Sequence, residues 1–227
     1  MHFEKALNAT IEALPYMLGG VGWTAIILIG ALLVGFVLGV PLACCQVYGR
    51  PALSRAVGLY VWLFRGVPIL VQLFLFYFGL LPLVGIDSAL AAGVIVLGFT
   101  SASYQSQIVR GSIQSLSAGQ LKAARALGMS DFTAIKSIIL PQALRLSIPG
   151  WSNEFSILLK DSALLMVISV PEIMARTRSV AGRTHEPVAM ALFAAILYFI
   201  LTYVGIQILR WIERKVRIKG YSQEGSM

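Results

Sequence analysis

Five apolar stretches, separated by shorter polar and basic segments, dominate the hydropathy pattern of this chain. They cover residues 22–46, 68–84 (with 60–64 leading into it), 90–108, 155–170 and 188–212. A helix needs roughly 20 apolar residues to cross the hydrocarbon core of a bilayer, which is about 30 Å thick. The pattern therefore predicts an all-α membrane protein with about five transmembrane helices, in which residues 1–227 form one domain.

Basic residues lie mainly after the first, third and fifth stretches, at Arg50, Arg55, Arg65, Arg110, Lys122, Arg125, Lys136, Arg145, Arg210, Arg214, Lys215, Arg217 and Lys219. Because cytoplasmic loops carry an excess of Lys and Arg, we expect the N-terminus outside and the C-terminus in the cytoplasm. The segment between the fourth and fifth stretches breaks this rule with Arg176, Arg178 and Arg183. Two interpretations stay open: a docking surface for an external partner, or charges that membrane insertion tolerates.

The composition also indicates a membrane protein, because 58% of the residues are hydrophobic and only 12% are charged. Soluble domains carry roughly 25% charged residues. The net charge of +8 would suggest a nucleic-acid partner in a soluble chain. Here the excess of Lys and Arg in cytoplasmic loops accounts for the basic residues, and no nucleic-acid partner is expected. The adjacent Cys44 and Cys45 suit neither a disulfide nor a metal site, and the first stretch is too long for a cleaved signal.

Small residues recur at every fourth position of the first stretch, at Ala31, Gly35 and Gly39. This spacing lets two helix backbones approach closely. It predicts helix packing, within the subunit or between subunits, and carries no information about a substrate.

The segment 111–150 is too patterned for a slack loop. Ser117 and Gln120 have the spacing of a capping box, and Gly128 suits a left-handed helix end. Ser130 can cap a second helix, whose apolar face of Phe132, Ile135 and Ile139 is expected to end at Pro141. The pattern predicts two short amphipathic helices joined at a glycine turn. Such a hairpin could lie on lipid or insert into a groove of a soluble partner.

Residues 123–130 (AARALGMS) and 139–145 (ILPQALR) resemble the "EAA" loop of ABC importer permeases, in particular the branch for polar amino acids such as histidine and glutamine. Residues 65–73 (RGVPILVQL) and 158–164 (LLKDSAL) are similar to further segments of that branch. Two positions depart from its pattern, because Lys122 and Gln107 stand where glutamates are usual. The resemblance implies that the loop docks on an ATPase subunit through Lys122, Ala123, Ala124, Leu127, Gly128, Met129 and Phe132.

The same resemblance implies the partners. These are ABC ATPase subunits, an extracytoplasmic substrate-binding protein, and a second permease subunit that is identical or homologous. The sequence lacks the glycine-rich phosphate-binding loop of ATPases, so ATP hydrolysis is expected in a separate chain. No catalytic residue, metal ligand or cofactor is expected. The implied location is the prokaryotic inner membrane, surrounded by lipid.

Polar residues inside apolar stretches are candidates for function, because their burial in lipid is costly. In the third stretch, Thr100, Ser103, Tyr104 and Gln107 form one helical stripe beside Ser101. This stripe either packs on other helices or lines a wet cavity. In the fourth stretch, Asp161 could accept the ammonium of an amino acid and Lys160 could meet its carboxylate.

Gln72 could face the same cavity, and Glu172 is a candidate gate or docking residue. A purely structural role for these polar residues is the alternative.

The sequence thus predicts the permease subunit of an ATP-driven importer for a polar amino acid, without indicating which one. The main alternative is a secondary transporter driven by an ion gradient. That class is expected to show inverted repeats with paired broken helices, and no convincing second copy is found. A channel or a structural anchor would leave the patterned hairpin unexplained.

Overall fold

A computed structural model describes residues 2–216, with side chains described from Glu12 onward. Positions 217 and 219, counted above among the basic residues, lie outside this range. Every described element is helical, as expected: α1 (His2–Tyr48), α2 (Pro51–Gly66), α3 (Ile69–Phe74), η1 (Leu75–Leu80), η2 (Pro82–Val84), α4 (Ala89–Ser115), α5 (Gly119–Ala126), α6 (Asp131–Ala134), η3 (Ile135–Ile139), α7 (Leu140–Leu146), α8 (Ile148–Asp161), η4 (Ser162–Ile168), α9 (Ile173–Thr184) and α10 (Pro187–Val216).

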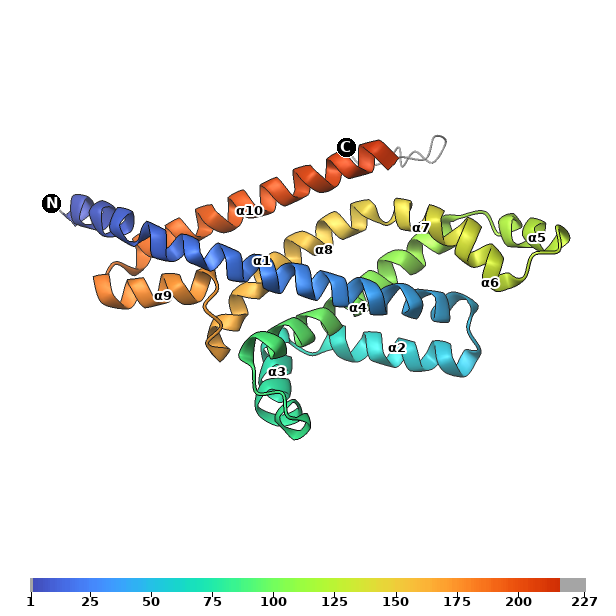
Figure 1. Ribbon diagram of the computed structural model, residues 1–227, viewed down its shortest axis with the longest axis horizontal. Helices are drawn as coiled ribbons and strands as arrows, with labels where there is room; N and C mark the ends of the chain where they lie inside the picture. The colour runs from blue at the N-terminus through green and yellow to red at the C-terminus, as the bar shows by residue number, and fades with distance from the viewer. Residues whose placement is uncertain (1, 217–227) are drawn as a thin grey trace.

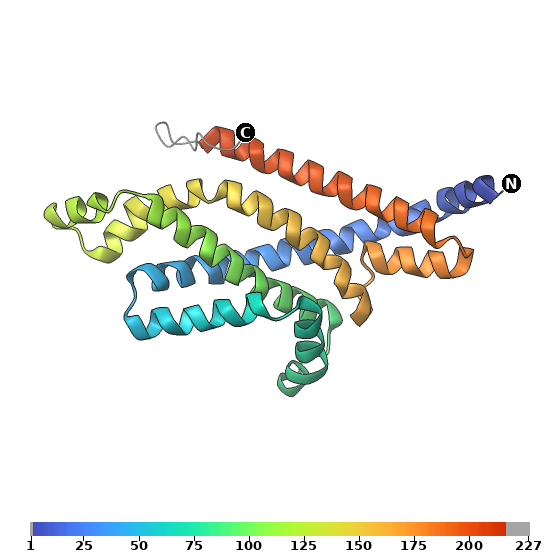
Figure 2. The same ribbon diagram turned by 180° about the vertical axis from the view of Figure 1, so that it is seen from behind.

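The molecule is elongated, and α1 and α4 pack along each other through its middle (Figures 1 and 2). The small residues predicted for packing lie at this contact. A Cβ atom on Gly35 would lie 2.5 Å from Nε2 of Gln105 and 2.6 Å from Oγ of Ser101. A Cβ atom on Gly39 would lie 3.0 Å from the carbonyl oxygen of Ala102. The packing prediction is therefore confirmed, and the contact is within this chain.

Within the described part of the chain, three helices are long and apolar enough to cross a membrane, namely residues 12–48 of α1, α4 and α10. A fourth candidate is α2 together with residues 69–84, a pair that bends by 103° at its break. The predicted stretch 155–170 is not one continuous α-helix. Its α-helical part, α8, ends at Asp161, and a 3₁₀ helix, η4, continues to Ile168. The structure thus supports three or four candidate spans by composition, and a count of five stays a prediction.

The largest buried apolar cluster joins α1, α3, α4, α8 and η4, with side chains that include Ile27, Leu73, Leu97, Leu159 and Leu165. A second cluster joins the end of α1 and α4 to the base of the hairpin, through Ala43, Val109, Ile113, Ile139 and Ala143. The helix at the centre of both clusters is α4. Its polar residues Thr100, Ser101 and Ser103 are consequently buried between helices.

The predicted hairpin is present, formed by α5 and α6, and it projects from one end of the molecule (Figure 1). Gly128 has a φ of 80° in the turn, and Ser130 caps α6 by accepting from the Thr133 amide at 3.2 Å, both as predicted. The capping box is not formed as predicted: α5 begins at Gly119, the Ser117 hydroxyl accepts from the Gly119 amide at 3.3 Å, and the Gln120 side chain pairs with Gln142. Pro141 does not end the helix, since the wider π-helical turns of η3 precede it and α7 continues to Leu146.

Candidate functional site

Most of the polar stripe predicted on α4 is buried in helix packing. Thr100, Ser101 and Ser103 are at most 3% exposed. The Ser103 hydroxyl donates to the Thr100 carbonyl oxygen at 2.6 Å, a local bond that satisfies it without any ligand. Tyr104 and Gln107, which lie on the same stripe, are instead half-buried and line a pocket. The structure therefore divides the stripe into a packed part and a part that faces a cavity.

Gln72 braces the bend between α2 and α3. Its side-chain amide donates to the carbonyl oxygens of Phe64 at 3.0 Å and Val67 at 2.8 Å, and its own carbonyl oxygen accepts from the Thr100 hydroxyl at 3.1 Å. The Phe64 carbonyl loses its helical donor because Pro68, four residues later, has no N–H. The Val67 carbonyl lies beyond the end of α2, and the Val71 amide bonds to Pro68 instead. Both the amide nitrogen and the carbonyl oxygen of the Gln72 side chain therefore bond to other parts of the protein, and the side chain is 4% exposed.

A buried carboxylate that sequence reasoning missed lies on α8. Glu154 is 3% exposed, and it hydrogen-bonds with the side chain of Ser101 on α4. The Ser101 hydroxyl oxygen also accepts a 3.0 Å hydrogen bond from Gln105. The signal was present in the sequence, because Glu154 precedes Asp161 by seven residues and so shares its helix face. The predicted span begins one residue later, at position 155, and so excludes Glu154.

The charges around Glu154 are mixed. Asp161 is half-buried at the end of α8, and both it and Arg65 on α2 lie within electrostatic range of the Glu154 carboxylate. Lys160 is exposed and acts on Asp161 from the neighbouring position. Two carboxylates on α8 and one guanidinium on α2 therefore act on one another across α4, which packs against both helices. This arrangement can attract a molecule that carries both positive and negative groups.

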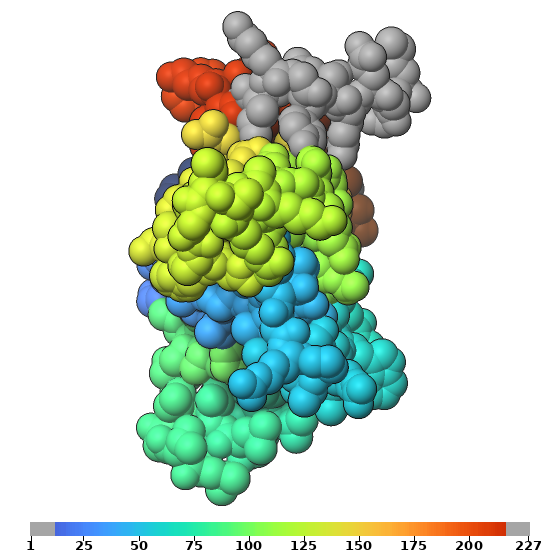
Figure 3. Space-filling view, turned by 90° about the vertical axis from the view of Figure 1, so that its right-hand side faces the viewer, coloured from blue at the N-terminus to red at the C-terminus, as the bar shows by residue number. Residues whose placement is uncertain are grey.

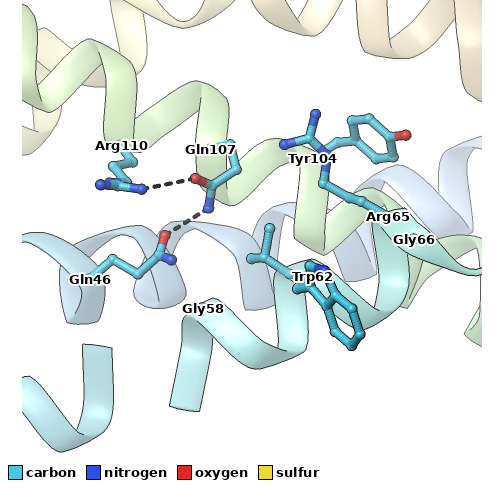
Figure 4. A pocket seen from close by; sticks show the side chains of 9 residues that line it. Gln46, Gly58, Trp62, Arg65, Gly66, Tyr104, Gln107 and Arg110 are labelled. Carbon is cyan, nitrogen blue, oxygen red and sulfur yellow. Dashed lines mark hydrogen bonds between the residues drawn. The ribbon is translucent and has the colours of Figure 1, made fainter. Parts of the chain in front are cut away.

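Arg65 also belongs to the pocket that α1, α2 and α4 enclose. Its guanidinium carbon lies 4.6 Å from the centre of the Tyr104 ring, a cation–π contact. The pocket has a volume of about 520 Å³ and is lined by Gln46, Gly58, Val61, Trp62, Arg65, Gly66, Tyr104, Gln107 and Arg110 (Figure 4).

Glu172 lies at the start of α9, at the end of the molecule away from the α5–α6 hairpin (Figure 1). It is fully buried and caps α9, accepting from the backbone amides of Met174 at 2.8 Å and Ala175 at 2.6 Å. The Tyr198 hydroxyl on α10 donates to the same carboxylate at 2.6 Å. The carboxylate of Glu172 thus ties α9 to α10, and its predicted gating or docking role stays a prediction.

The hairpin is braced by a two-pronged contact between Arg125 and Asp131, with distances of 2.7 and 2.8 Å. Hydrogen bonds from Arg125 hold the pKa of Asp131 below its usual value. Ala124 is buried, whereas Lys122 and Ala123 are exposed. Leu127 and Phe132 are 82% and 73% exposed. In the end-on view the hairpin stands beside the α1–α2 turn with nothing of the described chain in front of it (Figure 3).

Comparison with known proteins identifies the family. The family model described as "Binding-protein-dependent transport system inner membrane component" matches residues 32–218. The chain is 34% identical over 210 residues to the histidine/lysine/arginine/ornithine permease protein HisM of Salmonella typhimurium, which covers 88% of this chain and 89% of HisM. It is 33% identical over 212 residues to the arginine permease protein ArtQ of Bacillus subtilis, covering 92% and 96% of the two chains.

Solved structures agree with this assignment. A crystal structure of an amino acid ABC transporter with histidines matches with a TM-score of 0.81 and 29% identity, covering 91% of this chain and 97% of that one. The MetNI methionine transporter, at 20% identity and a TM-score of 0.80, shares the fold. The chain therefore belongs to the binding-protein-dependent ABC permease family, in its polar amino acid branch, and is the non-catalytic, multi-pass inner-membrane subunit of a bacterial amino acid importer.

Proposed function

We propose that this permease carries a cationic amino acid, along a path beside Glu154, Asp161 and Arg65. The observation that carries the proposal is the pair of carboxylates on one face of α8, one of them 3% exposed. A charge at the centre of a membrane costs about 2.5–3.5 kcal/mol on insertion scales, so its retention needs a compensating function. A cationic amino acid has two positive groups and one carboxylate, which complement two acids and one guanidinium. Several related permeases are named for such amino acids.

The other predicted substrate residues fit this path to different degrees. Ser101 and Thr100 lie beside Glu154 and Gln72 respectively, where they position those side chains. Tyr104 holds the guanidinium of Arg65. Lys160 is exposed in the single chain, so its contact with a carboxylate would require a cavity completed by the second permease subunit. Gln72 would act on the substrate only through the bend that it braces.

The hairpin of α5 and α6 is the proposed contact with the ATPase subunit. Leu127 and Phe132 expose large apolar surfaces at its tip, close to Lys122, Ala123, Gly128 and Met129. Such a tip suits insertion into a groove of a soluble protein. This role requires the predicted topology, with five spans, the N-terminus outside and the hairpin in the cytoplasm, within a single domain. An extracytoplasmic binding protein would then deliver the amino acid to the opposite end, which carries Arg176, Arg178 and Arg183.

The test is transport by the assembled complex. The permease, purified with its ATPase and binding protein and placed in liposomes, should take up radiolabelled L-arginine, L-lysine or L-histidine only when ATP is supplied. Glutamine and glutamate should compete poorly. Glu154→Gln should lower uptake of the cations at least tenfold, and Glu154→Asp should restore part of it. Uptake that follows an ion gradient without ATP would instead favour the secondary transporter, and unchanged uptake by Glu154→Gln would remove the acid from the path.

A further inference from the structure

The pocket between α1, α2 and α4 contains a second arginine for which the proposed path has no use. Arg110 projects from α4 toward Gln107, and its Nη1 donates to the Gln107 side-chain oxygen at 3.2 Å (Figure 4). The amide nitrogen of Gln107 in turn donates to the side-chain oxygen of Gln46 at 2.7 Å. This chain of neutral amides holds the guanidinium in place but supplies no negative charge.

The Arg110 guanidinium is incompletely satisfied. Among the residues that the structure describes, its Nε atom is buried and has no hydrogen-bond partner. None of the nine residues lining this pocket is acidic. Arg110 is half-buried and lines the pocket, so an anion can reach its guanidinium there. A guanidinium with no carboxylate in the surrounding lining is a binding element for an anion. The pocket offers room for one, because a Cβ atom added to Gly58 or Gly66 would meet nothing within 4 Å.

The two arginines lie at different heights along the same pocket. Arg65 is stacked on Tyr104, and Arg110 follows six residues later on α4, which corresponds to roughly 9 Å of helix rise. Arg65 is also in electrostatic range of Glu154, whereas Arg110 lies toward the end of α4 that leads into the hairpin. The pocket therefore extends from the proposed substrate path toward the hairpin end of the molecule.

We propose that this pocket is an exit subsite for the carboxylate of the transported amino acid, which passes from Arg65 to Arg110 before release. The inference rests on the proposed function for the identity of the cargo. The geometry that carries it is separate: a cavity of about 520 Å³ with two guanidinium groups and no acid. Gln107 is the residue that leaves Arg110 available, because a carboxylate at that position would pair with the guanidinium internally.

The experiment uses the fluorescence of Trp62, which lines the pocket. The complete permease–ATPase complex in nanodiscs of neutral lipid is titrated with L-arginine and, in parallel, with agmatine, which is the same cation without the carboxylate. The signal of interest is the part of the fluorescence change that disappears in Trp62→Phe. We expect L-arginine to produce it and agmatine not to. Arg110→Gln and Gln107→Glu should each lower the affinity for L-arginine at least tenfold, whereas Arg110→Lys should keep part of that affinity.

Several results would overturn the subsite. Equal responses to agmatine and L-arginine would show that the pocket recognises the cation, and an unchanged titration with Arg110→Gln would remove the arginine from it. A response seen only after anionic lipid is added would assign the pocket to a phosphate headgroup, and competition by inorganic phosphate alone would indicate general anion binding. Failure of the proposed function looks different: ATP-driven uptake of L-arginine would be absent in the wild type, while its carboxylate-dependent binding persisted.

Discussion

Replacing Gln72 by leucine tests whether this residue braces the bend or binds the substrate. The substitution removes both donors from the Phe64 and Val67 carbonyls and the acceptor from the Thr100 hydroxyl. Each buried polar group left without a partner costs about 1–3 kcal/mol. The Thr100 hydroxyl can turn to a carbonyl of its own helix, so the two carbonyls of α2 account for most of the cost. The expected loss of stability is about 2–6 kcal/mol. Gln72 is 4% exposed, which leaves little access for water to replace the lost donors.

The assay is thermal unfolding of the purified permease in nanodiscs, followed together with L-arginine uptake by the assembled complex. A brace predicts a clear fall in Tm for Gln72→Leu. Gln72→Glu should also lose stability, because it keeps the acceptor for Thr100 but removes both donors. Matched controls at exposed Val71 report the effect of substitution in α3 alone. A Gln72→Leu protein that melts like the wild type but has lost substrate affinity would refute the brace and support a ligand role.

Three further outcomes follow from the structure. Gly35→Leu should lower stability by about 1–3 kcal/mol or prevent accumulation, because even its Cβ would crowd α4, whereas Gly22→Ala, which meets nothing within 4 Å, should melt like the wild type. Leu127→Ser should leave the permease folded and release the ATPase during co-purification; retention at wild-type yield would argue against the docking role. Asp131→Asn should lower the Tm slightly. Because the folded-state pKa of Asp131 is lowered, this difference should be complete above the ordinary pKa of about 3.9 and disappear as the pH falls through the lower value.

The parts of the fold that depend on local spacing were predictable from the sequence. The close approach at Gly35, the left-handed turn at Gly128 and the cap at Ser130 each follow from one residue type at one position. The bend before Gln72 was not predictable in the same way. Pro68 signals a break, but the angle depends on the Gln72 amide reaching back to the Phe64 and Val67 carbonyls and on Thr100 of α4 holding that amide. Pro141 failed as a helix end because a π-helical segment absorbs the missing hydrogen bond.

In the candidate site, too, the features that depend on local spacing were predictable and those that depend on tertiary contacts were not. The hydropathy pattern locates apolar stretches well but places their ends poorly. Glu154 lies one residue before the predicted stretch 155–170. Its pairing with Asp161 follows from a seven-residue spacing, but its burial depends on α4 lying across α8. Arg110 and Gln107 were visible in the sequence as polar residues, and only the tertiary arrangement places Gln46 and the α2 glycines around them.

The seven residues of η4 give the chain an adjustable length next to Asp161. As a 3₁₀ helix they extend about 14 Å, whereas the same residues in α-helical form would extend only about 10 Å. Ser169, with a φ of 66°, ends this segment and anchors it near α9. Rewinding η4 would therefore pull the carboxyl end of α8 outward by about 3–4 Å without unfolding anything. Because η4 continues directly from α8, that displacement would act first on Asp161, the last residue of α8.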